Sequence, residues 1–206
     1  MSNGISWIQV PDSIIRDPNI SALDFCILLS LKYAYYLSGS KDNMFEMDFN
    51  VIKRALDIND NRTLKKSLAK LHKQKYIIND VVIHRKKLSE VMLNKVLFNK
   101  PFTQLPTKLL SRVEVIGFIG IRLLYYYESF IVRSETMNQF CYASQEAIQR
   151  DTGISIRSIV QYNKELKKAK LLDITEHKVR VEYDKDGNMN WERYSNHYDV
   201  RLENLL

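Results

Sequence analysis

The segment Tyr142–Leu172, YASQEAIQRDTGISIRSIVQYNKELKKAKLL, has the pattern of two short amphipathic helices joined at a glycine. Ser144 and Ser155 precede the two helices, and a serine oxygen there accepts hydrogen bonds from free amides of the first turn. Gly153 suits the left-handed backbone that ends a helix. Apolar side chains at helical spacing give the second helix a core-facing side: Ile159, Tyr162 and Leu166. The segment alone is compatible with two interpretations. Its second helix could lie in a DNA groove, or the two helices could only close a hydrophobic core.

The same pattern occurs earlier in the chain, displaced by 95 or 96 positions. WIQVPDSIIRDPNISALDFCILLSLKYAYY, residues 7–36, aligns with FTQLPTKLLSRVEVIGFIGIRLLYYYESFI, residues 102–131. RTLKKSLAKLHKQKYI aligns with RSIVQYNKELKKAKLL, which places Arg62 on Arg157. Identity is low, but the order of features is preserved. We therefore expect two copies of one unit, residues 1–100 and 101–206.

Each unit begins with a proline-containing lead-in and a long apolar helix, expected near 21–37 and 115–132. Then come a short strand, a short helix capped by Asp48 or Ser144, and a third helix capped by Asp60 or Ser155. The expected strands are Met44–Met47 and Phe140–Ala143, and the expected third helices are 61–74 and 156–169. A β-like pair follows each third helix, and Asp186-Gly187 in the second pair is a strong hairpin signal. The sequence thus predicts a mainly α fold with small β wings, in the α+β class, made of two tandem winged helix-turn-helix domains.

Positive charge is concentrated in the first unit. The net charge is +7 and the pI about 9.3. Residues 1–100 hold 16 Lys and Arg against 10 Asp and Glu, whereas residues 101–206 hold 15 against 14. A basic balance favours a polyanionic partner, here double-stranded DNA. The alternative is a basic protein whose charge serves only solubility.

The third helices supply the candidate DNA-binding residues. A helix-turn-helix reads DNA with the polar, cationic outer face of its second helix, where Arg contacts guanine and Gln contacts adenine. Between Arg62 and Lys75 there are six Lys or Arg, one His and no acidic residue. The candidates on the helices are Asn61, Arg62, Thr63, Lys65, Lys66 and Lys70 in the first unit, and Arg157, Ser158, Gln161 and Lys164 in the second. The candidates on the wings, expected at phosphates or in the minor groove, are Arg85, Lys86, Lys87, Lys178, Arg180 and Lys185.

Residue patterns typical of enzymes are missing, so we expect no catalytic activity, metal or cofactor. The four histidines form no His-x-His pair, the two cysteines lie 115 residues apart, and no Gly-rich phosphate loop occurs. The run Tyr125–Tyr127 invites comparison with a recombinase nucleophile, but we expect these rings to pack in a helix with their hydroxyl groups in water. Cys26 and Cys141 fit as small core residues in a reducing cytoplasm. No signal pattern or long apolar run predicts a membrane segment.

Two stretches, IQVPDSIIRDPNISALDFCILLSLKYAYY and TLKKSLAKLHKQKYI, resemble the N-terminal winged helix of plasmid and phage replication initiators. The segment Tyr142–Leu172 is similar to generic winged-helix regulators and to the second module of tandem winged-helix initiators. The resemblance implies binding to repeated origin sequences, sometimes under dimer–monomer control, with a second copy or host replication proteins as further partners. The family's long linking helix is not evident here, because VMLNKVLFNKPFTQLP is typical of a strand and a proline lead-in.

Three functions follow from the sequence. The first is a replication initiator that binds an origin. The second is a transcriptional regulator or a centromere-binding partition protein, which uses the same chemistry at a different DNA site. The third is a winged-helix scaffold that binds proteins, such as a helicase-loading or segregation factor. Salt dependence separates the third from the other two, because neutralising phosphates makes affinity fall steeply with salt.

Overall fold

A computed structural model describes residues 6–84, 87–134, 139–177, 180–183, 189–192 and 195–205, with only the backbone given for 180–183 and 189–192. It is a mixed structure in which helices predominate and strands form small antiparallel sheets. The α-helices are α1 Asp12–Ile15, α2 Ala22–Ser38, α3 Phe49–Ala55, α4 Asn61–Lys73, α5 Val113–Glu128, α6 Gln145–Thr152 and α7 Ile156–Lys168. The strands are β1 Trp7–Pro11, β2 Met44–Met47, β3 Ser89–Met92, β4 Phe102–Pro106, β5 Leu172–Thr175, β6 Arg180–Tyr183, β7 Met189–Glu192 and β8 His197–Val200. Within the described ranges there are also three 3₁₀ helices: η1 Lys95–Phe98, η2 Thr107–Arg112 and η3 Leu202–Asn204.

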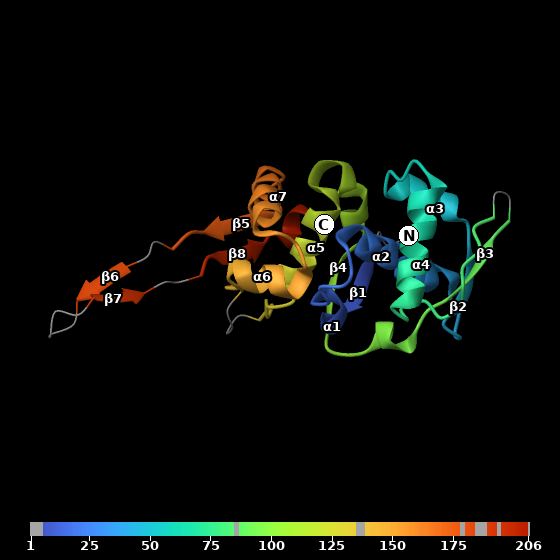
Figure 1. The fold of residues 1–206 in the computed structure, drawn as a ribbon, viewed down its shortest axis with the longest axis horizontal. Coiled ribbons are helices and arrows are strands. Elements are labelled where there is room, and N and C mark those ends of the chain that lie inside the picture. Colours follow the sequence, from blue (N-terminus) through green and yellow to red (C-terminus); the bar gives the residue numbers. More distant parts are fainter. Residues whose placement is uncertain are drawn as a thin grey trace.

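The strands pair as β1 with β4, β2 with β3, β5 with β8 and β6 with β7. The molecule is elongated, with α2 and α5 in the middle and strands extending toward both ends (Figure 1). Among the residues whose structure is described, no helix is long and apolar enough to cross a membrane.

The helix starts follow the predicted caps. The side chains of Asp48, Asp60, Ser144 and Ser155 each accept a hydrogen bond from a main-chain amide two or three residues further on. Gly153 ends α6 with a φ of 69°, in the left-handed region. These short-range signals depend only on neighbouring residues, so they were predictable from the sequence.

The core at the centre of the molecule joins α2 to α5. The rings of Phe25 and Tyr125 meet edge to face, with 5.5 Å between their centroids. The Tyr125 hydroxyl donates to the carbonyl oxygen of Ile8 at 2.9 Å. Arg122 has no exposed surface, and its guanidinium donates to the carbonyl oxygens of Ile20 and Asp17. The two halves of the chain therefore share one hydrophobic core.

Strands β1 and β4 relate the halves by an approximate two-fold axis. Gln9 lies opposite Gln104, its counterpart 95 positions later, and Trp7 lies opposite Pro106. Main-chain bonds outside the ladder follow the same rule: the Asp12 amide donates to the Pro101 carbonyl at 3.1 Å, and the Thr107 amide donates to the Ser6 carbonyl at 2.9 Å. Thr107 is the counterpart of Asp12 and Pro101 is the counterpart of Ser6, so the two hydrogen bonds are equivalent. The axis therefore passes between Gln9 and Gln104, whose side chains form a hydrogen bond at 3.3 Å.

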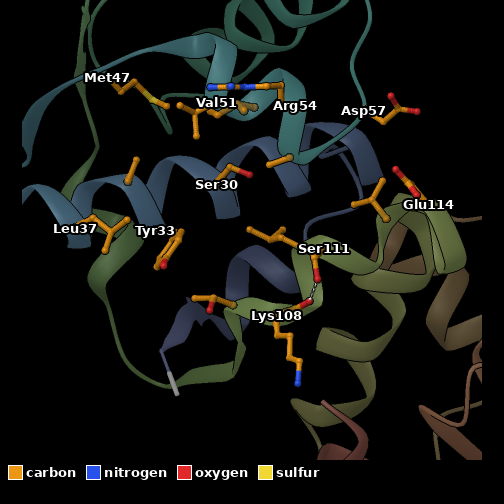
Figure 2. Close-up of a pocket in the computed structure, with 16 residues that line it drawn as sticks. Ser30, Tyr33, Leu37, Met47, Val51, Arg54, Asp57, Lys108, Ser111 and Glu114 are labelled. Carbon is orange, nitrogen blue, oxygen red and sulfur yellow. Dashed lines mark hydrogen bonds between the residues drawn. The ribbon is translucent and has the colours of Figure 1, made fainter. Parts of the chain in front are cut away.

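The packing beside the axis differs between the two sides. In the second half the contact is closed, because a Cβ atom at Gly153 would lie 2.6 Å from the Pro18 carbonyl oxygen, and Arg16 stacks on Phe130 at 4.0 Å. In the first half, residues of α2 and α3 face residues of η2 and of the start of α5 across a gap. An open, largely apolar cleft of about 680 Å³ remains there, lined by side chains of both halves, with Asp57 and Glu114 at one end (Figure 2).

Two predicted elements of the second half are wrong in detail. The helix expected at 115–132 is α5, which ends at Glu128 and has a non-helical residue, Gly117, with φ 64° and ψ 173°. A side chain there would meet the Tyr162 ring, with a Cβ atom 2.8 Å from it, so helix packing requires glycine. The strand expected at Phe140–Ala143 is only a single bridge between Cys141 and Tyr198.

The β pair expected after α4 forms only at its base. The Ile78 amide donates to the Met92 carbonyl at 2.8 Å and Ile77 forms a bridge with Leu93, whereas β3 pairs along its length with β2, which the sequence did not predict. The Asn79 side chain accepts from the Met92 amide at 2.8 Å and donates to the Glu90 carbonyl at 3.0 Å. A side chain thus takes hydrogen bonds that a neighbouring strand would take. After α7, β5 pairs with β8, and β6 with β7, as an extended hairpin.

Tyr125, Tyr126 and Tyr127 pack inside, but their hydroxyl groups are not in water. All three side chains are buried, and the last two hydroxyls donate to Asp151 and Asn163 at 2.9 and 2.8 Å. The apolar periodicity of the sequence predicted the buried rings. It carried no information about these distant partners.

Candidate nucleic-acid interface

Helix α4 has one apolar and one cationic side. Leu64, Leu68 and Leu71 are buried against the core, whereas Arg62, Lys65 and Lys66 are exposed. Neither Lys65 nor Lys66 forms an ion pair with any residue of the described ranges. A helix face that carries several cations and no acid presents a positive surface suited to phosphate groups.

Lys70 and Asn61, two of the predicted DNA-binding residues of α4, have side-chain partners within the protein. The Lys70 ammonium lies 3.5 Å from a carboxylate oxygen of Asp24, whose side chain is only 2% exposed. The side-chain oxygen of Asn61 accepts a hydrogen bond from Lys53 at 2.9 Å, which links α4 to α3. We therefore expect Lys70 to stabilise the fold and Asn61 to hold the turn, with weaker contributions to DNA contact.

Thr63 and Ser158 occupy equivalent positions and complete the helix caps. The Thr63 hydroxyl donates to the Asp60 carboxylate at 2.7 Å, and the Ser158 and Ser155 hydroxyls are 2.8 Å apart. Hydrogen bonds from Thr63 hold the pKa of Asp60 below its usual value. Both residues were predicted from the sequence to contact DNA. Their position three residues after the capping residue is the signal for the capping role that the structure shows.

Helix α7 presents a polar outer face opposite its buried side chains. Arg157, Gln161 and Lys164 are exposed, with Arg157 and Gln161 about one turn apart. On the inner side, the side-chain oxygen of Asn163 accepts a hydrogen bond from the Tyr127 hydroxyl at 2.8 Å, which fixes α7 against α5. The structure therefore brings these three predicted residues together on one rigid helix.

The wing residues are only partly described. Lys87 is exposed, just before β3. Of Arg180 only the backbone is given, in β6 opposite Glu192. The remaining predicted wing residues lie outside the described residues: Arg85, Lys86, Lys178 and Lys185.

The two-fold axis places α4 and α7 on either side of the central α2–α5 pair (Figure 1). A two-fold axis leaves equivalent surfaces at the same height along it. The β1–β4 register makes α4 and α7 the equivalent helices of the two halves, as the corresponding helices are in a symmetric dimer.

The described residues show neither a metal-ligand cluster nor a tyrosine or cysteine activated as a nucleophile. No cluster of His, Cys, Asp or Glu there could hold a metal ion. Burial raises the pKa of Tyr125, Tyr126 and Tyr127 above the usual value, which opposes a nucleophilic role. Burial also raises the pKa of the Cys141 thiol to about 12.

Comparison with known proteins does not assign a family. No protein-family model matches the chain, and no curated protein is significantly similar to it.

Proposed function

We propose that this protein binds double-stranded DNA sequence-specifically through two winged helix-turn-helix units, residues 1–100 and 101–206. Helices α3–α4 and α6–α7 form the two helix-turn-helix pairs, β2–β3 forms the first wing, and the β5–β8 strands form the second. The observation that carries the proposal is the acid-free outer face of α4, with Lys65 and Lys66 unpaired among the described residues.

The two units divide the task. The α4 unit carries most of the positive charge and supplies affinity through phosphate contacts. The α7 unit is nearly neutral and presents Arg157 and Gln161, side chains that form paired hydrogen bonds with guanine and adenine. Affinity and base reading are thus concentrated on different helices.

Titration of labelled duplexes at several salt concentrations tests DNA binding. Counterion release predicts that the logarithm of the association constant falls linearly with the logarithm of salt concentration, with a slope of about −0.9 per phosphate neutralised. A selection from random duplexes then gives the preferred sequence. Salt-independent binding, or no enrichment, contradicts the proposal and favours a protein-binding scaffold.

Within this proposal, the first biological role is origin binding by a plasmid or phage replication initiator. It rests on the resemblance of the lead-in and of the first and third helices to that family. A transcriptional regulator or partition protein would use the same contacts elsewhere on the DNA. Sequencing of the fragments bound from the parent replicon distinguishes these roles by the position of the sites.

A further inference from the structure

A second cavity, of about 520 Å³, lies next to the two-fold axis between β1, α2 and η1. Its walls are mainly aromatic, and Tyr35 packs on Phe98 with 5.1 Å between the ring centroids. The polar groups are few and include the side chains of Gln9 and Gln104, one from each half. The aromatic residues of the lining are Trp7, Tyr33, Tyr35, Tyr36 and Phe98. This volume and lining fall within the range of small-molecule sites.

Lys32 of α2 also lines this cavity and is only 8% exposed. Its ammonium donates to the Leu97 carbonyl and lies 4.8 Å from the centre of the Phe98 ring. No described carboxylate lies within ion-pair distance of it. An ammonium has three donors, and a buried charge is costly without a partner of opposite charge. Burial accordingly lowers the pKa of Lys32 to about 8, which leaves it mostly protonated at neutral pH.

The equivalent cavity of the second half, about 490 Å³, contains its own complete ion pair. There the carboxylate of Glu128, which is 8% exposed, lies 2.6 Å from Arg133. Arg133 also donates to the Val200 carbonyl at 2.8 Å. One cavity thus has the cation Arg133 and the two carboxylates Glu128 and Asp12 in its lining, whereas the lining of its counterpart has only the cation Lys32.

We propose that the cavity at Lys32 binds a small aromatic carboxylate. The carboxylate pairs with the Lys32 ammonium, the ring packs among Tyr35, Tyr36 and Phe98, and the amides of Gln9 and Gln104 supply further hydrogen bonds. Because those two amides come from different halves, the ligand adds a contact that both halves share. A ligand that binds only the folded chain raises its stability by mass action.

The test compares 1-naphthoate with its neutral amide, 1-naphthamide, as probes of the full-length chain. Binding is followed by NMR at the indole N–H of Trp7 and the side-chain amides of Gln9 and Gln104. We expect the acid to bind roughly tenfold more tightly than the amide, as one ion pair with a buried ammonium predicts. Lys32→Met keeps the length of the side chain without its charge and should bring the two affinities together. Lys41→Met, at an exposed lysine outside the cavity lining, is the matched control and should preserve the difference.

A second measurement needs no variant. The pKa of Lys32, followed in the wild-type chain by the chemical shift of its ε-carbon, should rise when naphthoate saturates the protein, because an adjacent anion favours the ammonium. An unchanged pKa, equal affinities for acid and amide, or no binding of naphthoate up to its solubility limit overturns the proposal. Those results would leave Lys32 as a residue that only caps the end of η1. DNA binding is measured separately, so either proposal can fail without the other.

Discussion

At the scale of single residues, exposed cations of α4 differ in what surrounds them. Lys65 and Lys66 have no ion-pair partner within the described ranges, whereas Lys70 lies beside the buried carboxylate of Asp24. In the sequence the three lysines look equivalent. The partner that distinguishes Lys70 lies 46 residues away in the chain, so local sequence does not reveal it. Exposure and charge were predictable from helical spacing, but the ion pair was not.

The first prediction separates these lysines. Lys65→Ala and Lys66→Ala should each weaken binding to all duplexes and make the salt slope about one unit shallower. Lys70→Ala should change the slope less and lower the free energy of unfolding, because Asp24 loses its cation. Salt titrations and urea denaturation of the three variants measure both effects. Unchanged slopes for Lys65 and Lys66 would exclude α4 from the DNA contact.

The second prediction concerns base reading by α7. Arg157→Ala should cost about 1–3 kcal/mol at one base position and relax the preference there, because a paired hydrogen bond to guanine is lost. Selection from random duplexes with the wild type and the variant measures it. Lys167→Ala, on an exposed residue in the last turn of the same helix, serves as a control that should keep the wild-type sequence preference. Identical preferred sequences for Arg157→Ala and the wild type would contradict base reading by this residue.

The third prediction concerns pH. Burial alone would raise the pKa of Asp17, but hydrogen bonds from the Tyr76 hydroxyl at 2.6 Å and from Asn19 lower it overall. A carboxyl with a lowered folded-state pKa stabilises the fold above its unfolded-state pKa, near 3.9. That stability disappears as the pH falls through the folded-state value.

Denaturation between pH 6 and pH 2 tests this linkage, with unfolding free energies measured for the wild type and Asp17→Asn. The wild type should lose stability more steeply on acidification than Asp17→Asn, whose amide does not titrate. Tyr76→Phe removes the main hydrogen bond to the carboxylate and should give an intermediate slope. Parallel curves for the wild type and Asp17→Asn would contradict the lowered pKa.

At the scale of elements, local signals determined most helices, and distant contacts determined the rest. Caps at Asp60 and Ser155 predicted the starts of α4 and α7 correctly. The break at Gly117 was missed, because it depends on the Tyr162 ring from another helix. The pairing of β3 with β2 was missed for the same reason, because it joins segments that lie far apart in the chain.

The fourth prediction tests how α5 is tied to the segment between α1 and α2. Arg122→Met should lower the free energy of unfolding by about 3 kcal/mol, because buried carbonyl oxygens of Ile20 and Asp17 lose a charged donor. Arg122→Lys keeps a charge but not the planar fork, so it should recover only part of the loss. Urea denaturation of the three proteins measures these differences. Equal stability of the wild type and Arg122→Met would show that the buried guanidinium adds nothing.

At the scale of the whole molecule, the repeat was predictable and its geometry was not. The shift of 95 positions is present in the sequence, but the axis depends on pairing between Trp7–Pro11 and Phe102–Pro106, far apart in the chain. This pairing, together with the α2–α5 core, joins the halves into one body. The candidate site therefore consists of two helices whose separation and orientation are fixed, as in a rigid dimer.

The fifth prediction follows from this rigidity. Two recognition helices related by a two-fold axis suit successive major grooves on one face of the duplex, about 10–10.5 base pairs apart. We expect one chain to protect roughly 20 base pairs, with two contacted patches about one helical turn apart. The halves carry different side chains at equivalent places, such as Lys66 and Gln161, so the two half-sites should differ in sequence.

Hydroxyl-radical footprinting of a complex of known stoichiometry measures this geometry. Lys66→Ala should weaken protection in one patch first and Arg157→Ala in the other, which assigns each half of the chain to its half-site. Because the two recognition faces differ, the bound sequence should be directional or an imperfect repeat. A strict palindrome protected by two chains, with only one unit of each chain on the DNA, would contradict the prediction. That outcome would identify a dimeric regulator in which the other unit serves assembly.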